Sequence, residues 1–130
     1  MGSTDIERVR ASFRRCNADC EFIDHFYQRF MESSPEVTAK FAAVDMDHQA
    51  VMMRASLELL LRHAPRRTEL APLVELHSRR GVDIPPRLYQ CWLDSLLGTV
   101  KAHDPQCDDA LLGAWRRVLL PGIGLMSEGY

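Results

Sequence analysis

Apolar residues recur every three or four positions through most of this chain, which is the spacing of amphipathic helices. A first helix is expected from about residue 5 to about residue 15, with one apolar stripe formed by Ile6, Val9 and Phe13. After a break near residues 17–19, a second helix carries five large apolar side chains, which are Phe22, Ile23, Phe26, Tyr27 and Phe30. The first part of the chain is therefore predicted to form two consecutive helices.

Helix-start and helix-stop residues divide the middle of the chain. Ser34 followed by Pro35 is a hydroxyl cap with proline in the first turn, and it predicts a short helix ending near Phe41. Asp45 is expected to cap the next helix, which Pro65 should stop because proline breaks the hydrogen-bond ladder. The segment between these two prolines is thus expected to hold one short and one long helix.

Two further helices follow in the same way. Thr68 opens the segment ELAPLVELHSRR, and Gly81 is expected to end it in a left-handed conformation. Pro85 and Pro86 are expected to begin a helix that reaches about His103.

The last helix completes an all-helical pattern. Asp104 and Pro105 lead into it, it contains Trp115, and Pro121 with Gly122 should kink or end it. No segment alternates apolar and polar residues at the period of a strand, and Leu, Ala, Arg, Glu and Met outnumber the β-branched residues. The sequence predicts an all-α fold of six or seven helices, in a single domain spanning its 130 residues.

Charge and hydropathy exclude several classes of function. The formal net charge is only -2, which gives no general affinity for nucleic acid or anionic lipid. No apolar run approaches the roughly 18 residues of a membrane span. The first residues lack the apolar core of a signal peptide, and Ile6 stands where myristoylation favours a hydroxyl. We therefore expect a cytoplasmic protein that binds neither nucleic acid nor membrane.

The four cysteines do not form a recognised metal or haem-attachment motif. Cys16 and Cys20 have the spacing C-x-x-x-C with no following histidine, which differs from the C-x-x-C-H of covalent haem attachment. Buried cysteines often act as small hydrophobes. Incidental thiols are the favoured interpretation, and a redox pair of Cys16 with Cys20 is the alternative.

His77 is the strongest single candidate for a functional residue. It follows Leu73 and Leu76 on an apolar helical face, where a core histidine satisfied by a backbone carbonyl is the ordinary interpretation. The functional interpretation is a neutral imidazole bound to a metal, with its other nitrogen donating to a carbonyl such as that of Leu73. No H-x-x-x-H, C-x-x-C or carboxylate cluster accompanies it. A metal bound here would bring most of its own ligands, as haem does.

Residues before and after His77 occur in an order that resembles the globin family, most closely the short single-domain bacterial globins that are myoglobin-like. The resemblance covers about Glu7 to Met126 and depends on the order and spacing of Phe26-Tyr27, Phe41, Gln49, His77, Gly81-Val82 and Ala114-Trp115. It implies a globin-like helical sandwich around a haem pocket, with haem b (iron protoporphyrin IX) as the cofactor.

The same resemblance implies a role for each of five residues. His77 matches the proximal histidine that ligates the iron, and Phe41 matches the aromatic residue that packs on the haem at a corner. Tyr27 matches the distal tyrosine, Gln49 the distal polar residue and Met53 the apolar residue over the iron. Tyr27 and Gln49 could hydrogen-bond to a bound gas that carries partial negative charge, and such a bond contributes about 1.5–3 kcal/mol. Phe41 and Met53 would keep the site dry.

One of these assignments has a rival, because the loop after Phe41 departs in length from the family pattern. His48 could take the distal position instead of Gln49. Helical phase favours Gln49, since its face also carries the apolar residues Met46, Met53, Leu57, Leu60 and Leu61.

The remaining candidates are pocket walls and cations. Haem propionates need cationic partners, and the candidates near in sequence are Arg54, Arg79 and Arg80, for which a solvated face is the alternative. Five residues are expected to line the pocket or the core, with plain core favoured for Trp115: they are Val82, Tyr89, Trp92, Trp115 and Leu119. His25, His63 and His103 receive no role.

Reversible binding of dioxygen or another diatomic gas, such as NO or CO, is the leading functional hypothesis, and no catalytic residue is assigned. A second hypothesis is nitric oxide dioxygenation or peroxidase-like turnover, for which a separate reductase would supply electrons. A third is a redox protein in which Met53 or His48 occupies the sixth iron position. A fourth is a helical interaction domain without haem. A monomer or weak homodimer is expected in each case.

Overall fold

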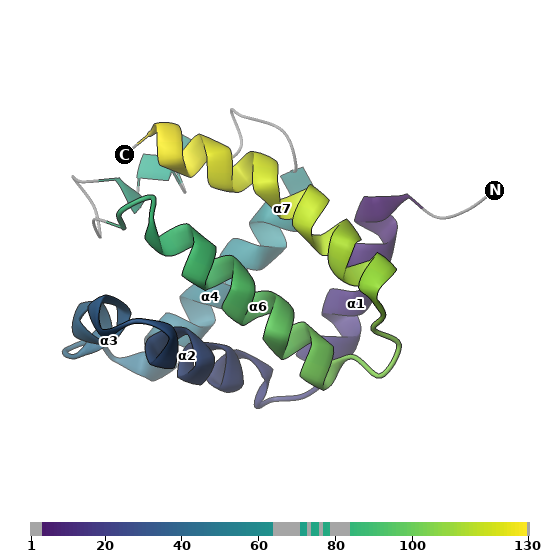
Figure 1. The fold of residues 1–130 in the computed structure, drawn as a ribbon, viewed down its shortest axis with the longest axis horizontal. Helices are drawn as coiled ribbons and strands as arrows, with labels where there is room; N and C mark the ends of the chain where they lie inside the picture. Colours follow the sequence, from purple (N-terminus) through teal and green to yellow (C-terminus); the bar gives the residue numbers. More distant parts are fainter. Residues whose placement is uncertain (1–3, 64–70, 73, 76, 79–83, 130) are drawn as a thin grey trace.

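The computed structural model describes residues 4–63, 71–72, 74–75, 77–78 and 84–129, and helices make up its regular structure. They are α1 (Asp5–Asn17), α2 (Phe22–Ser33), α3 (Pro35–Phe41), α4 (Met46–His63), α6 (Leu88–His103) and α7 (Asp109–Glu128), shown in Figure 1. Residues 71–72, 74–75 and 77 are also helical. No strand occurs in the described part of the chain, so the all-α prediction is confirmed.

Side-chain caps explain why several helices begin where they do. The Oγ1 atom of Thr4 accepts a hydrogen bond from Glu7 N at 3.3 Å, and Ser34 Oγ accepts from Glu36 N at 3.2 Å. Asp45 Oδ1 accepts from Asp47 N and His48 N at 3.1 and 3.3 Å. Such caps satisfy backbone N–H groups that have no partner inside the helix.

One predicted helix start differs from the structure, and the helix end at Pro121, which was expected as the alternative to a kink, does not occur. Helix α6 begins at Leu88, and not at Pro85 or Pro86. A residue before proline is kept out of the helical conformation, so Pro85 cannot be helical, and backbone bonds from Leu88 N to Pro85 O and from Tyr89 N to Pro86 O form a turn first. Helix α7 continues through Pro121 to Glu128. Proline has no N–H, so Pro121 cannot donate a hydrogen bond to the carbonyl of Arg117 one turn earlier. Both residues are exposed, so water can bond to that carbonyl instead.

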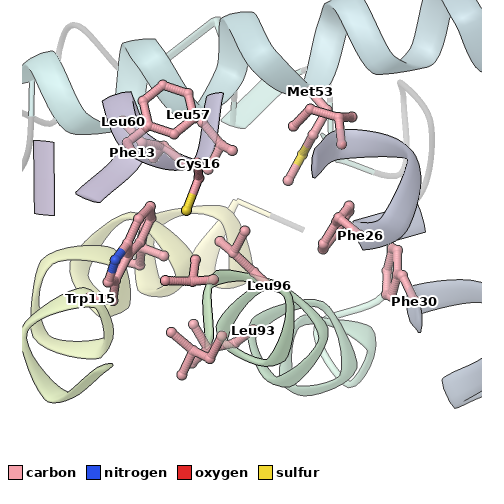
Figure 2. Packing of buried hydrophobic residues seen from close by; sticks show 14 of the residues in the cluster. Phe13, Cys16, Phe26, Phe30, Met53, Leu57, Leu60, Leu93, Leu96 and Trp115 are labelled. Atoms are coloured by element: carbon pink, nitrogen blue, oxygen red, sulfur yellow. The ribbon is translucent and has the colours of Figure 1, made fainter. Parts of the chain in front are cut away.

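The helices pack in pairs around one apolar cluster. Helix α2 packs on α6, α1 packs on α7, and α6 also contacts α7, so that α6 runs through the centre of the view in Figure 1. Figure 2 shows Phe26 and Met53 on one side of the buried cluster, and Phe13, Cys16 and Trp115 on the other. Trp115 is fully buried, as its preferred assignment to the plain core expects.

The segment that carries His77 lies against the end of α7. A Cβ atom added to Gly129 would overlap Val74 Cγ1, so the Val74 side chain packs directly on the backbone of Gly129. The end of α7 is shown in Figure 1. The His77 carbonyl accepts a hydrogen bond from Ile84 N at 3.1 Å, which ties the segment to the start of the α6 region. None of the described helices combines the length and apolar character needed to cross a membrane.

Cys16 and Cys20, for which a redox pair was the alternative interpretation, lie in two different environments. Helix α1 ends at Asn17, so Cys16 lies in the helix and Cys20 lies in the turn beyond it. Cys16 is fully buried and Cys20 is exposed, and both are free thiols. Burial raises the pKa of Cys16 to about 12, which keeps that thiol protonated and unreactive. These features fit incidental thiols better than a redox pair.

Candidate functional site

A cavity of about 510 Å³ lies between α2, α3, α4, α6 and the segment that contains His77. Its size falls in the range of small-molecule and cofactor sites. The lining is mostly apolar and aromatic, and its described residues are Tyr27, Phe30, Val37, Lys40, Phe41, Val44, His48, Gln49, Met52, Met53, Ser56, Leu60, His77, Ile84, Leu88, Tyr89, Trp92 and Met126. Most of the residues singled out from the sequence therefore meet in one cavity.

A tyrosine and a glutamine form a hydrogen bond at the wall made by α2 and α4. Gln49 Nε2 donates to the Tyr27 hydroxyl oxygen at 3.0 Å. Because that oxygen accepts from Gln49, the hydrogen of the Tyr27 hydroxyl is available to donate to a third group. Phe41 packs edge-on against the Tyr27 ring, with ring centroids 5.4 Å apart, and holds it in place.

The hydroxyl of Tyr27 remains a donor throughout the physiological pH range. Its side chain is only 4% exposed, and this burial raises the pKa of Tyr27 to about 12, against a smaller opposing effect of the Gln49 hydrogen bond. Loss of its proton would place a phenolate in an apolar pocket. The pair therefore presents a neutral hydrogen-bond donor to the cavity.

The imidazole-bearing segment contributes His77 to the same cavity. His77 is half-buried, and it shares the lining with Leu88 and Met126, which come from α6 and α7. The expected acceptor for its outer nitrogen, the carbonyl of Leu73, lies outside the described residues.

Tyr89, which sequence reasoning treated as a wall residue, lines the cavity and also carries a buried hydroxyl. It is 5% exposed, and its hydroxyl has no hydrogen-bond partner among the described residues. Burial raises the pKa of Tyr89 to about 12, so this hydroxyl is also neutral. A buried hydroxyl without a partner is costly, and a polar group of a bound molecule would relieve that cost.

The fold and sequence are shared with a solved bacterial protein. A protein of Pseudomonas aeruginosa PAO1, whose crystal structure is described as structurally highly homologous to a human hemoglobin, matches with a TM-score of 0.93. The two sequences are 40% identical, and the match covers 98% of each chain. The chain belongs to the globin family. No family model matches this globin, and no curated protein matches it either.

The structure of this globin places both distal candidates at the cavity. Gln49 reaches Tyr27, and the stripe expected to face inward with it is buried at Met53, Leu57 and Leu60. His48 is exposed but also lines the cavity, one residue before Gln49. Of the two candidates, Gln49 is the one with a described hydrogen bond to Tyr27.

Of the three predicted cations, only Arg54 lies in the described residues, and it points elsewhere. Arg54 of this globin donates from Nε to Asn17 Oδ1 at 2.7 Å and does not belong to the described cavity lining. Arg79, Arg80 and Val82 lie outside the described residues. Lys40, which sequence reasoning did not consider, lines the cavity. Its position directly before Phe41 was a usable signal, because a residue beside a pocket aromatic lies near the pocket edge.

The remaining wall candidates divide between pocket and core. Trp92 lines the cavity of this globin and contacts Phe26, with ring centroids 6.1 Å apart. Leu119 and Trp115 are buried in the core and are absent from the described cavity lining.

Proposed function

We propose that this globin binds haem in the cavity and reversibly binds dioxygen or another diatomic gas there. The main support for this proposal is that Tyr27 and Gln49, which are hydrogen-bonded to each other, line the same cavity as His77. In this arrangement His77 could bind a metal, and the Tyr27 hydroxyl could donate a hydrogen bond to a gas bound to that metal.

The residues present fit a haem group on three counts. The walls are apolar and aromatic, with Phe41, Met53 and Trp92 among them, as a flat macrocycle requires. Within the described ranges, no group of three or more His, Cys, Asp or Glu side chains is arranged to hold a metal ion. One histidine, His77, can serve a metal that arrives with its other ligands, and haem supplies an iron centre that binds diatomic gases.

Four polar residues of the cavity each have a part in this proposal. His77 would hold the haem iron, and Lys40 would be the partner for a propionate carboxylate. Tyr27 donates its hydroxyl hydrogen to the partial negative charge of a bound gas, while Gln49 holds that hydroxyl in the donating orientation. Phe41 and Met53 exclude water, which slows oxidation of the iron.

An absorption spectrum of the purified ferrous protein under argon and under air tests the proposal. We expect a Soret band, a five-coordinate spectrum under argon and a distinct spectrum under air. A colourless protein that takes up no added haem would refute haem binding. A six-coordinate low-spin ferrous spectrum would instead support the redox alternative, with Met53 or His48 as the sixth ligand, since both line the cavity.

Replacement of Tyr27 with phenylalanine is expected to speed dioxygen release. The lost hydrogen bond to a partly charged acceptor contributes about 1.5–3 kcal/mol, which corresponds to a roughly 10- to 100-fold faster dissociation. Stopped-flow displacement of dioxygen by CO measures this rate.

The matched control removes a hydroxyl group that does not line the cavity. Thr99 is fully buried in α6, its hydroxyl donates to Ser95 O at 2.7 Å, and it is absent from the described cavity lining. Thr99→Val should leave the dissociation rate unchanged. Equal rates in wild type and Tyr27→Phe would show that Tyr27 does not contact the gas.

A further inference from the structure

Two histidines that the cavity does not use meet where α2 lies beside the end of α6. His25 Nδ1 and His103 Nε2 are 2.7 Å apart, and the ring planes are tilted by 41°. The outer nitrogen of each ring faces a carboxylate. His103 Nδ1 lies 2.7 Å from Asp19 Oδ2, and His25 Nε2 lies 3.5 Å from Glu21 Oε2.

The carboxylates determine where the ring protons reside. An ionised carboxylate only accepts hydrogen bonds, so His103 Nδ1 carries the proton that it donates to Asp19. His103 Nε2 then carries a lone pair, and neutral His25 can donate its Nδ1–H to it across the 2.7 Å separation. Glu21 Oε2 lies 3.5 Å from His25 Nε2, where it can pair with that nitrogen when the proton moves from Nδ1 to Nε2.

Asp19 is held ready for this role. Its Oδ1 atom accepts a hydrogen bond from Glu21 N at 2.9 Å, which fixes the turn between α1 and α2. Its Oδ2 atom lies 2.7 Å from His103 Nδ1, so an N–H at that nitrogen donates to the carboxylate and the lone pair of the ring lies on Nε2.

We propose that His25 Nδ1 and His103 Nε2 form a binding site for a divalent transition metal ion of the Zn²⁺ or Cu²⁺ type. Imidazole suits these ions, and metal-bound histidines usually donate their other N–H to a carboxylate, which is the arrangement formed here by Asp19 and Glu21. Without the metal, the His25 Nδ1–H donates to His103 Nε2. Binding of the metal ion requires the His25 proton to move from Nδ1 to Nε2, beside Glu21, so that both inner nitrogens offer lone pairs to the metal.

The geometry requires only a small adjustment. Tetrahedral zinc with Zn–N bonds of about 2.0–2.1 Å separates two nitrogen ligands by about 3.3 Å. The rings must therefore move apart by about 0.6 Å from their 2.7 Å separation. The side chain of His25 is 43% exposed, so it can move and leaves room for water to complete the coordination. In the described part of the chain the site has two protein ligands and no third.

A bound ion would join α2 to α6. Helix α2 carries Tyr27, two residues after His25, and α6 carries Tyr89 and Trp92. The metal would thus tie together two helices that both contribute to the cavity lining. Because it binds the folded chain and not the unfolded one, saturating Zn²⁺ is expected to raise the Tm by about 3 °C or more.

Calorimetric titration of the purified full-length chain with ZnCl₂ tests the proposal, independently of haem. We expect one Zn²⁺ per chain, with affinity at least tenfold lower in His25→Gln and in His103→Gln. Asp19→Asn should also weaken binding about tenfold, because it removes the charged partner of the metal-bound ring. His48→Gln, which changes an exposed histidine at the cavity, and titration with MgCl₂ are the controls.

Two outcomes would overturn the site. One is the absence of saturable Zn²⁺ binding by the wild-type chain. The other is unchanged binding in His25→Gln, which alters a partly exposed side chain and decides the matter even if His103→Gln does not fold. Loss of binding in Cys20→Ser, with full binding in His25→Gln, would assign the ion to the exposed thiol of the same turn.

Discussion

Replacement of His77 with glycine is expected to abolish normal axial ligation of haem in this globin. His77 and His48 are the described histidines that line the cavity, and His77 is the one that matches the iron-binding histidine in the resemblance to globins. The variant should lose the five-coordinate ferrous spectrum and release haem readily. Added imidazole, which fits the space left by the side chain, should restore the spectrum.

The control for this prediction is the other histidine of the cavity. His48 is exposed and lines the cavity from α4. His48→Gln should retain the wild-type spectrum under argon. A wild-type spectrum in His77→Gly without imidazole, or its loss in His48→Gln, would assign the axial ligand to another residue.

The sequence predicts the helices of this globin well because their ends are fixed by neighbours in the chain. The caps at Thr4, Ser34 and Asp45 each bond to backbone N–H groups two or three residues later. The start of α6 was harder to predict, because two successive prolines impose opposite preferences. Proline suits a first helical turn, yet Pro86 keeps Pro85 out of the helix.

The part of the site on α4 was predictable, because the spacing of apolar residues shows which face of that helix points inward. The face of α4 that contains Gln49 is the apolar one, and the structure places Met53 and Leu57 in the interior on that face. Phase alone could not show that Gln49 reaches Tyr27, because the pair is 22 residues apart in the chain. Likewise, the bond of Arg54 to Asn17 depends on how α1 lies against α4, and the sequence does not state that packing.

A buried polar network away from the cavity shows more clearly that contacts between residues far apart in the chain were not predictable. Asp104 follows α6, and its side chain is fully buried. Its carboxylate accepts hydrogen bonds from Ser12 Oγ at 2.6 Å, from Arg15 Nε and Nη2 at 2.7 and 2.9 Å, and from Gln106 N at 2.9 Å. Trp115 Nε1 donates to Ser12 Oγ at 3.0 Å. The sequence indicated only a helix boundary at Asp104, because the partners on α1 lie about 90 positions away.

We expect Asp104→Ala to lower the free energy of unfolding by about 3–5 kcal/mol, the usual cost of breaking a buried ion pair from one side. The change leaves the Arg15 guanidinium, the Ser12 hydroxyl and the backbone N–H of Gln106 without their acceptor. Urea denaturation followed by circular dichroism measures the loss. Asp94→Ala, which alters an exposed carboxylate on α6, should cost no more than about 0.5 kcal/mol.

Asp104→Asn removes the negative charge of the side chain but keeps its shape, and its effect on the free energy of unfolding should depend on pH. Burial alone would raise the pKa of Asp104, but the bonds from Arg15, Ser12 and Gln106 outweigh it and hold the pKa below its usual value. A lowered folded-state pKa adds stability that is fully present above the unfolded pKa of about 3.9 and is lost as the pH falls through the folded value. Wild type should therefore be more stable than Asp104→Asn at pH 7, and the difference should shrink below about pH 4. A difference that stays constant from pH 7 to pH 3 would mean that shape, and not the charge of Asp104, joins α1 to the ends of α6 and α7.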